Sequence, residues 1–352
     1  MASGARQGPE QERTGACGTE SPMNSLRVGV AGLIHGHVWG LIDSWAKVEG
    51  AELTAVADHT PLLERAKDRF ARTYTDWREM LDKETLDALV VTSDNRESAE
   101  IAVAALGKGI PCLVEKAMAA NVADAERMLE AQRASGKLLV INWPFCWSPW
   151  VHELKRQLDS GVIGPVFHFR FRNGHHGPKE IGCDEWFVGW LYDEERNGGG
   201  ALADFCGYGA VLSRWLFGMP TTVFGVRDNF TKAYDVPDDH AILLARYPKM
   251  TAELEGTWAT YGFDESANPV VHGRDGTIGV YGNTLRIYRA GREVEVVEAP
   301  DLDVRSPAAY FATLLETGGE PEGMLHPLVS ADAVRIVEAG RNSAASGCAE
   351  PL

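Results

Sequence analysis

Between residues 27 and 141 one pattern repeats along the chain: a short apolar run is followed by a longer helical stretch. The runs lie at Arg27–Ala31, Leu53–Ala57, Ala88–Val91, Cys112–Val114 and Leu138–Ile141. Apolar runs of this length between turn residues are typical of buried parallel strands, which are joined by helical crossovers. Asn121 and Gly136 carry the signals of a helix start and a helix stop. We therefore expect a doubly wound, parallel α/β domain over residues 26–144.

The order of elements changes after Pro144. The elements expected there are a helix at Val151–Leu158, a strand at Pro165–Arg172, a loop rich in His, Gly and Trp, a helix near Tyr208–Phe217, four or five strands between Thr221 and Val297, and two helices at Ser306–Leu315 and Pro327–Ser343. Consecutive strands without helices between them predict an open, largely antiparallel sheet. Since 352 residues are enough for two ordinary domains, we expect a second α/β domain over residues 145–352.

The first 25 residues differ from the rest in composition. Residues 1–25 contain no Leu, Ile, Val or aromatic side chain. Such a segment cannot bury enough apolar surface to offset the entropy lost on ordering, so we expect a disordered tail. The sequence leaves open whether Met1 or Met23 is the natural start.

The chain as a whole is acidic, with 34 Lys and Arg against 50 Asp and Glu and a net charge of −16. This charge repels phosphate groups, so we expect neither nucleic acid nor a membrane surface as a partner. Apolar runs stay well short of the ~18 residues that span a bilayer, and the N-terminus lacks the apolar core of a signal peptide. We therefore expect a cytoplasmic protein. Its six scattered cysteines should be reduced thiols, because a disulfide framework or a zinc ribbon needs tighter spacing.

The turn after the first strand is the first candidate binding site. It consists of Gly32, Leu33, Ile34, His35, Gly36 and His37. Gly32 and Gly36 suit a tight turn whose backbone approaches a pyrophosphate, although Ile34 and His37 interrupt the Gly-x-Gly-x-x-Gly pattern. A strand-to-helix turn without any ligand explains these residues about as well. His35 and His37 suggest a metal pair, but no carboxylate or third ligand is evident, so we expect polar loop histidines and no metal.

Asp58 follows the second apolar run, 26 residues after Gly32. A carboxylate at that point can accept hydrogen bonds from a ribose diol, and it repels the additional phosphate of NADP. His59 and Thr60 provide no arginine for that phosphate, so these residues favour NAD over NADP. The alternative is that Asp58 caps the following helix. The residue alone does not distinguish a ribose-binding carboxylate from a helix cap.

Three further side chains are candidates for the chemistry. Lys116 follows Glu115 at the end of the fourth run, where open parallel sheets bind their ligands; the alternative is a solvated surface lysine. Asp204 and Tyr208 share a helical face, and a carboxylate beside a phenol can orient it. The glycines at 198–200 leave room for the close approach of a ligand. Alternatively, Asp204 is a helix cap and Tyr208 a core residue.

In their order along the chain, these motifs resemble the glucose–fructose oxidoreductase, inositol dehydrogenase and rhizopine-catabolism (Gfo/Idh/MocA) family. The matching stretches are the turn at 32–37, Ala55–Asp58, Thr92–Asn95, Ala105–Gly109, Glu115–Lys116, Gly161–Gly164 and Gly198–Asp204. Four features depart from the family pattern. The glycine turn at 32–37 has the less common form Gly-x-x-His-x-His. Ala117 replaces the proline after Glu-Lys, Ser98 replaces a histidine, and the stretch Cys146–Pro149 lacks the usual arginine.

The resemblance implies a Rossmann domain for NAD, followed by a domain whose open sheet often forms the interface of a homodimer or homotetramer. It places the cofactor against the turn at 32–37 and against Asp58, Thr92, Ser93, Asn95, Glu115 and Lys116. It also implies that Lys116 lies beside the substrate and that Asp204 belongs to the catalytic group. Tyr208 resembles the tyrosine that donates the proton in the branch with glucose–fructose oxidoreductase and dihydrodiol dehydrogenase.

These expectations combine in one hypothesis, an NAD-dependent oxidoreductase that transfers a hydride between a secondary alcohol of a sugar or polyol and the nicotinamide. Its catalytic residues would be Lys116, Asp204 and Tyr208. Its substrate contacts would be the same three together with His175, His176 and Trp186 of the loop at 173–190. Two alternatives stay open. An NAD-retaining glycosidase or lyase would oxidise the sugar transiently and act by elimination, whereas a non-catalytic sensor would only bind NAD or a sugar.

Overall fold

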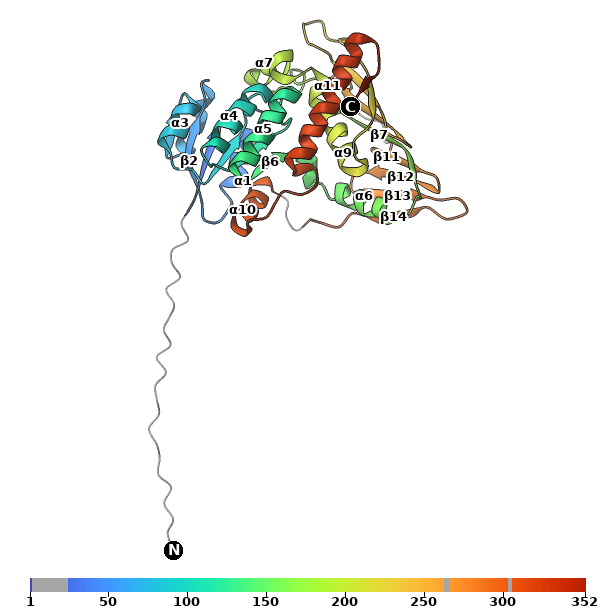
Figure 1. Ribbon diagram of the computed structural model, residues 1–352, viewed down its shortest axis with the longest axis horizontal. Coiled ribbons are helices and arrows are strands. Elements are labelled where there is room, and N and C mark those ends of the chain that lie inside the picture. Colours follow the sequence, from blue (N-terminus) through green and yellow to red (C-terminus); the bar gives the residue numbers. More distant parts are fainter. Residues whose placement is uncertain (2–24, 263–265, 303–305) are drawn as a thin grey trace.

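The polypeptide forms two sheets that lie side by side, with helices between and around them (Figure 1). The computed structural model describes residue 1 and residues 25–262, 266–302 and 306–352. The tail expected at residues 1–25 therefore lies almost entirely outside the described residues. Within the described ranges, no helix combines the length and the apolar character needed to cross a membrane.

The first sheet has six parallel strands in the order β3-β2-β1-β4-β5-β6. The strands are β1 (Leu26–Ala31), β2 (Ala51–Ala57), β3 (Arg72–Tyr74), β4 (Ala88–Val91), β5 (Cys112–Glu115) and β6 (Leu139–Asn142). The connecting helices are α1 (Val38–Trp45), α2 (Leu62–Ala66), α3 (Trp77–Lys83), α4 (Asn95–Gly107) and α5 (Val122–Ser135). The predicted doubly wound α/β architecture is confirmed. β3 was not predicted from the sequence, because its three residues are partly exposed and form no apolar run.

The second sheet has nine strands in the order β14-β13-β12-β11-β7-β10-β9-β8-β15. They are β7 (Val166–Gly174), β8 (Thr222–Asp228), β9 (His240–Arg246), β10 (Thr251–Thr257), β11 (Val270–Gly273), β12 (Gly276–Tyr281), β13 (Thr284–Tyr288), β14 (Glu295–Glu298) and β15 (Glu350–Pro351). β7 and β10 pair in parallel and the other neighbours are antiparallel, which confirms the predicted sheet. Seven strands, rather than four or five, lie between residues 221 and 298, because β11, β12 and β13 are short and separated by two-residue turns.

Helices cover the inner face of the second sheet, where α11 lies between the two sheets (Figure 1). The helices that follow the first domain are α6 (Pro149–Asp159), α7 (Glu185–Leu191), α8 (Glu194–Asn197), α9 (Gly207–Phe217), α10 (Pro307–Thr317) and α11 (Pro327–Ser346). Of these, α6, α9 and α11 contact the second sheet. α11 approaches β8 so closely that a Cβ on Gly225 would lie 2.1 Å from the carbonyl oxygen of Gly340. α10 returns to the first sheet and packs on α1, where the rings of Trp45 and Phe311 lie 6.1 Å apart.

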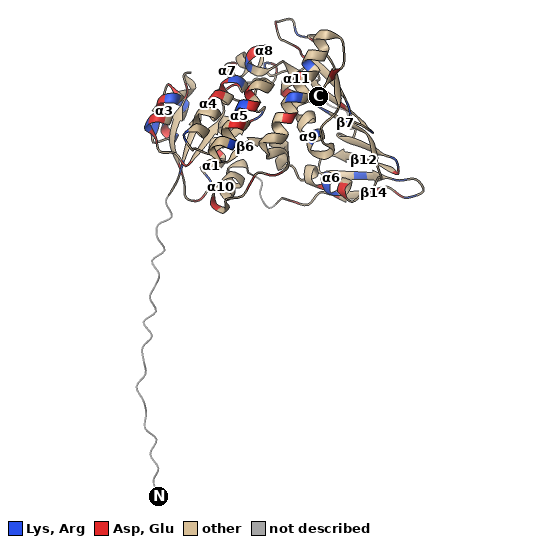
Figure 2. Ribbon diagram, viewed as in Figure 1, with Lys and Arg blue, Asp and Glu red and all other residues tan. Residues whose placement is uncertain are grey.

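Charged side chains line the helices, where acidic and basic groups are mixed (Figure 2). Examples are Lys83 with Glu79 on α3, at 2.5 Å, and Arg127 with Asp124 on α5, at 2.8 Å. Exposed pairs of this kind are screened by water and contribute little to stability. The fold is therefore held mainly by its apolar core, which extends through both sheets.

The five cysteines among the described residues are free thiols, as predicted, and Cys17 lies outside those residues. Burial raises the pKa of the Cys112, Cys146 and Cys206 thiols. These three are therefore protonated, apolar core residues at neutral pH.

Candidate active site

The predicted cofactor residues lie together at one edge of the first sheet, at or just beyond the carboxyl ends of β1, β2, β4 and β5. In an open parallel sheet ligands bind at this edge, at the point where the strand order reverses, which here lies between β1 and β4. The turns that follow these two strands contact each other. Thr92 Oγ1 donates to the carbonyl oxygen of Gly32 at 2.6 Å, and His35 N donates to the carbonyl oxygen of Thr92 at 3.2 Å.

Gly32 is required by this contact between the turns. Its φ is +87°, and a Cβ built on it would lie 2.5 Å from the backbone nitrogen of Ser93. A side chain at this position would fill the space in which the backbone of the turn can approach a ligand. The sequence prediction of a tight glycine turn fits this geometry.

Replacement of Gly32 by alanine should therefore both strain the backbone and push the two turns apart. We expect a cost of about 1–3 kcal/mol in unfolding free energy from the backbone conformation alone, with a further loss of cofactor affinity from the displaced turn. Gly136→Ala is the matched control, because Gly136 has a φ of +62° and no neighbour within 4 Å of its added Cβ. Thermal unfolding and NAD titration of both variants check the prediction. Equal NAD affinity in the two variants would contradict it.

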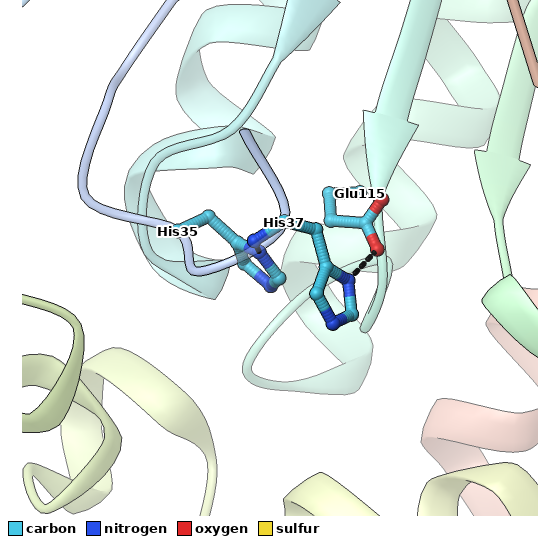
Figure 3. Close-up of side chains that lie close together, drawn as sticks. All are labelled: His35, His37 and Glu115. Atoms are coloured by element: carbon cyan, nitrogen blue, oxygen red, sulfur yellow. Dashed lines mark hydrogen bonds and ion pairs between the residues drawn. The ribbon is translucent and has the colours of Figure 1, made fainter. Parts of the chain in front are cut away.

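His35 and His37 of the turn meet Glu115 at the end of β5 (Figure 3). His37 Nδ1 lies 2.6 Å from Glu115 Oε1, and His37 N donates to His35 Nδ1 at 3.2 Å. His35 Nε2 lies 3.2 Å from the carbonyl oxygen of Lys116. Because a backbone N–H only donates and a carbonyl only accepts, His35 is neutral with its proton on Nε2. Burial, with the nearby charges of His37 and Lys116, lowers the pKa of His35 well below its usual value.

Glu115 is thus the carboxylate beside this histidine pair, which was not evident from the sequence. The three side chains place possible metal-ligand atoms within 4.8 Å of one another. Both nitrogens of His35 are already hydrogen-bonded, and Glu115 Oε2 accepts from Asn142 Nδ2 at 2.6 Å. A cation would have to displace these bonds. We interpret the three side chains as a structural cluster whose hydrogen bonds hold the turn at 32–37 against Glu115 and the backbone of Lys116.

Asp58 lies at the end of β2 with only 5% of its surface exposed. Its Oδ2 accepts from Leu33 N at 2.6 Å, and its Oδ1 accepts from Thr60 N at 2.7 Å. The cap position of α2 is taken by Pro61, so the alternative interpretation of Asp58 as the cap of that helix is wrong. Asp58 instead ties the end of β2 to the turn after β1.

Thr92, Ser93 and Asn95 are buried, and their side chains bond to protein groups. The Ser93 hydroxyl donates to Glu97, and Asn95 Nδ2 donates to Asn197 Oδ1 at 2.9 Å. Asn197 belongs to α8 of the second domain, so the bond between Asn95 and Asn197 connects the two domains. These bonds fix the side chains of Ser93 and Asn95 within the protein. Their contacts with the cofactor, which the resemblance implies, stay a prediction.

Further contacts between the domains cover the turn at 32–37. The ring of Phe187 on α7 lies 5.2 Å from that of His35, and Trp190 Nε1 donates to the carbonyl oxygen of Ile34 at 3.3 Å. Arg196 forms an ion pair with Asp94 at 2.8 Å, just before α4. The segment that contains α7 and α8 thus rests on the turn.

Lys116, Asp204 and Tyr208 come together in the interior. Lys116 Nζ lies 2.5 Å from Asp204 Oδ1 and 4.9 Å from the centre of the Tyr208 ring. Asp204 lies in a π-helical turn (Leu202–Cys206) that continues into α9, so the alternative of a helix cap at Asp204 is wrong. Tyr208 packs edge-on against Trp143 and Phe145, each with ring centres 5.2 Å away.

Burial and charge fix the protonation of these three groups. Burial lowers the pKa of Lys116, but the charge and hydrogen bond of Asp204 outweigh it and the pKa is raised. Burial raises the pKa of Asp204, but Lys116 outweighs this effect and the pKa is lowered. Burial raises the pKa of Tyr208 to about 12, with Lys116 as a partial offset. At neutral pH the site holds an ammonium–carboxylate pair beside a neutral phenol.

The glycines at 198–200 serve packing, and the prediction that they make room for a ligand is wrong for two of them. A Cβ on Gly198 would lie 2.4 Å from the carbonyl oxygen of Ala120, and one on Gly200 would lie 2.1 Å from that of Asp238. Asp238, which is fully buried, accepts from Gly200 N at 3.0 Å and from Leu202 N at 2.7 Å. It thereby anchors the turn that carries Asp204.

Sequence reasoning missed Trp258, which follows β10. Its side chain is fully buried, and its Nε1 donates to Asp204 Oδ2 at 3.0 Å. Both oxygens of Asp204 therefore have donors inside the protein, Lys116 and Trp258. In this arrangement Asp204 orients Lys116, and no sequence motif signals the contact because the two residues come from distant segments.

The predicted substrate residues lie on the segment before α8. His175 packs edge-on against Phe205 with ring centres 5.1 Å apart, and its Nδ1 accepts from Gly177 N at 3.0 Å. Burial lowers the pKa of His175, so its neutral ring carries the proton on Nε2. His176 stacks on Tyr261 at 5.1 Å, and Trp186 on α7 is 38% exposed. Of these residues, His175 is the one that acts electrostatically on Asp204.

Comparisons with known proteins agree with this architecture. Residues 26–143 match the family model described as an oxidoreductase family with an NAD-binding Rossmann fold, and residues 151–279 match the GFO/IDH/MocA C-terminal domain. D-apiose dehydrogenase of Paraburkholderia graminis is 24% identical over 306 residues, which are 80% of this chain and 78% of that protein. The inositol 2-dehydrogenase of Salmonella typhimurium is 30% identical, but over only 38% of this chain and 41% of its own.

Solved structures share the fold at lower identity. A levoglucosan dehydrogenase in complex with NADH and levoglucosan has a TM-score of 0.78 and 19% identity, over 93% of this chain and 99% of its own. An oxidoreductase of Agrobacterium radiobacter, in complex with NAD+, L-tartaric acid and magnesium, has a TM-score of 0.76 and 19% identity, over 93% of this chain and 98% of its own.

Proposed function

We propose, since the chain belongs to the Gfo/Idh/MocA family of oxidoreductases, that it is an NAD-dependent enzyme that transfers a hydride between a secondary alcohol of a sugar or polyol and the nicotinamide. The observation that carries the proposal is the buried group of Lys116, Asp204 and Tyr208 at the carboxyl edge of β5. Residues 26–144 bind the cofactor and residues 145–352 bind the substrate. The inositol, apiose and levoglucosan dehydrogenases among the relatives support a sugar or polyol substrate.

The residues at the edge of the first sheet fit a bound dinucleotide. Gly32 keeps side-chain atoms out of the turn, and Asp58 places a carboxylate beside it. The turn of residues 32–37 would hold the pyrophosphate, Asp58 the adenosine ribose, and Glu115 and Lys116 the nicotinamide half. When bound, NAD accepts the hydride from the alcohol carbon or returns it to the ketone.

The side chains of this site move the proton. In the reductive direction the neutral phenol of Tyr208 would donate its proton to the carbonyl oxygen of the substrate as the carbonyl carbon receives the hydride. The ammonium of Lys116 stabilises the negative charge that develops on that oxygen and on the phenol. Asp204 keeps Lys116 charged and oriented. His175 offers its Nε2–H as a donor to a substrate hydroxyl, and His176 and Trp186 complete the proposed substrate contacts.

A panel of sugars and polyols tests this function. We expect at least one of them to reduce NAD, seen as absorbance at 340 nm, with the formation of an equal amount of the matching keto compound. A complete panel, in both directions and with both NAD and NADP, that gives no turnover would contradict the proposal.

Asp58 should set the preference for NAD over NADP. Asp58→Asn removes the charge that repels an additional phosphate and weakens the acceptor for a ribose hydroxyl. A hydrogen bond to a charged group is worth about 1.5–3 kcal/mol, so we expect NAD affinity to fall about tenfold or more while NADP affinity stays or rises. Calorimetric titration with both dinucleotides measures this. An unchanged ratio of affinities would show that the preference lies elsewhere.

The outer face of the second sheet is proposed to join copies of this chain into a homodimer or homotetramer. Phe224, Leu244, Glu253 and Arg170 form one row across β8, β9, β10 and β7. Phe224 is 37% exposed and Leu244 is 49% exposed. Two such faces, related by a twofold axis, can place apolar rows together and acidic side chains near basic ones.

Leu244→Lys should therefore convert the oligomer to monomers, because a charge in a buried apolar contact is costly. Leu328→Lys is the control, since Leu328 is 44% exposed but lies on α11 rather than on the sheet. Light scattering after gel filtration distinguishes the two. A monomeric wild type, or an unchanged mass for Leu244→Lys, would contradict the proposed interface.

We also propose that the enzyme lies in the cytoplasm and has neither nucleic acid nor a membrane surface as a partner, in keeping with its net charge of −16.

A further inference from the structure

We infer that Trp258 is a positioning residue of this site: its indole N–H fixes the carboxylate of Asp204 in the orientation that holds Lys116. The inference rests on the function proposed above, because it concerns the geometry of the same catalytic group. Trp258 lies outside the motifs of the sequence, and it reaches Asp204 from the strand that ends at Thr257.

The geometry of Asp204 gives the indole this role. Lys116 donates to Oδ1 at 2.5 Å and Trp258 donates to Oδ2 at 3.0 Å. An indole nitrogen can only donate, so Trp258 cannot compete for the proton of Lys116 and can only bind the carboxylate. With one donor on each oxygen, the carboxylate cannot rotate without losing one of two hydrogen bonds to a charged group.

Trp258 itself is held in place from several sides. Its backbone N donates to the carbonyl oxygen of Asp239 at 2.6 Å, and the ring of Tyr192 lies 5.4 Å from its own at 50°. Its side chain is fully buried. A donor fixed in this way costs no reorganisation when charge shifts in the site, which is the general requirement for electrostatic preorganisation.

The other groups around Asp204 do not replace this donor. Asp204 interacts electrostatically with Lys116, Tyr208, His175 and Cys183. Lys116 also interacts with Glu115 and His35, and His175 also interacts with His176 and Lys232. Among the described residues, only Lys116 and Trp258 donate to the Asp204 carboxylate. Loss of the indole N–H would leave Oδ2 buried without a donor, which favours the protonated acid.

Trp258→Phe tests the inference by removing the N–H and part of the ring. We expect kcat to fall about ten- to hundredfold, the range for a lost hydrogen bond to a charged group, with the KM for the sugar changed less than threefold. The acid limb of the pH profile of kcat should move toward neutral pH, because the hydrogen bond from Trp258 lowers the pKa of Asp204. A purely structural role would not move this limb.

Two further variants separate this role from packing. Trp45→Phe is the matched control, since Trp45 is also buried but packs on Phe311 of α10, away from the site. It should lose stability without any change in kcat or in the pH profile. If Trp258→Phe does not fold, 3-benzothienylalanine at position 258 retains the shape of the indole and removes only the N–H.

The outcome for Asp204→Asn distinguishes a failure of the inference from a failure of the proposed function. If Asp204→Asn is inactive while the folded Trp258 variants have wild-type kcat and acid limb, the inference is overturned and the proposed function stands. If Asp204→Asn retains full activity, the assigned catalytic group is wrong and the inference falls with it. A reduced kcat with a shifted acid limb in the Trp258 variants, alongside an inactive Asp204→Asn, supports both.

Discussion

Lys116→Met is expected to lower kcat/KM by about 10³-fold, since the ammonium lies against both Asp204 and Tyr208. Removal of a preorganised donor from a transition state typically costs about 10²–10³ in rate. The loss should lie at the upper end of this range, because in the proposed mechanism the same cation also stabilises the charge on Tyr208 as its proton moves. Steady-state kinetics in both directions, with circular dichroism to confirm folding, measure the effect.

The folding of this variant needs a control of its own, because it leaves Asp204 buried without its partner, a change that costs about 3–5 kcal/mol in unfolding free energy. The double variant Lys116→Met, Asp204→Asn removes both charges and should recover stability but not activity. Lys108→Met breaks an exposed pair with Asp82, at 2.7 Å, and should change neither property. Activity within threefold of wild type in a folded Lys116→Met variant would exclude Lys116 from catalysis.

Tyr208→Phe is expected to lower kcat by about 10²–10⁴-fold, the range over which a positioned general acid or base contributes. The substitution keeps the ring that packs on Trp143 and Phe145 and removes only the hydroxyl. Cofactor affinity and thermal stability should therefore change little. Tyr247→Phe, at a second buried tyrosine that packs near Phe217, is the control for loss of a buried hydroxyl.

The pH dependence of the two directions gives Tyr208 a distinct signature. Burial raises its pKa to about 12, so the phenol is neutral across the physiological range. Alcohol oxidation needs the deprotonated form and should accelerate as pH rises toward that value, by about tenfold per unit in the limiting case. Carbonyl reduction uses the neutral form and should be flat near neutrality and fall only in alkaline solution. An alkaline rise in oxidation that persists in Tyr208→Phe would show that another group accepts the proton.

Much of the first domain was predictable because its signals are local. The strand β4 has the bounds that its apolar run predicted, and α5 begins after Asn121 and ends at Gly136, which has a φ of +62°. Position along a strand also predicted that Lys116 would lie at the ligand-binding edge of the sheet. The spacing of Asp204 and Tyr208 put both on one helical face, even though the turn between them is π-helical.

The rest of the site depends on contacts between distant segments, for which the sequence has no local signal. Glu115 meets His37 across 78 residues, and Trp258 meets Asp204 across 54. From the sequence, the glycines at 198 and 200 were predicted to leave space for a ligand. In the structure, the backbones of Ala120 and Asp238 fill the space that a side chain at these two positions would need. Only the tertiary packing decides which group fills the space beside a glycine.

The most direct test of the account is to follow the transferred hydrogen. The protein is incubated with NAD and with sugars and polyols that carry deuterium on the carbons bearing the hydroxyl groups. The mass of the dinucleotide is then measured by mass spectrometry. We predict reduced NAD that carries one deuterium, formed together with the matching keto compound. Sugar that is cleaved or left unchanged while all the dinucleotide remains as unlabelled NAD would contradict the assignment of this protein as a dehydrogenase.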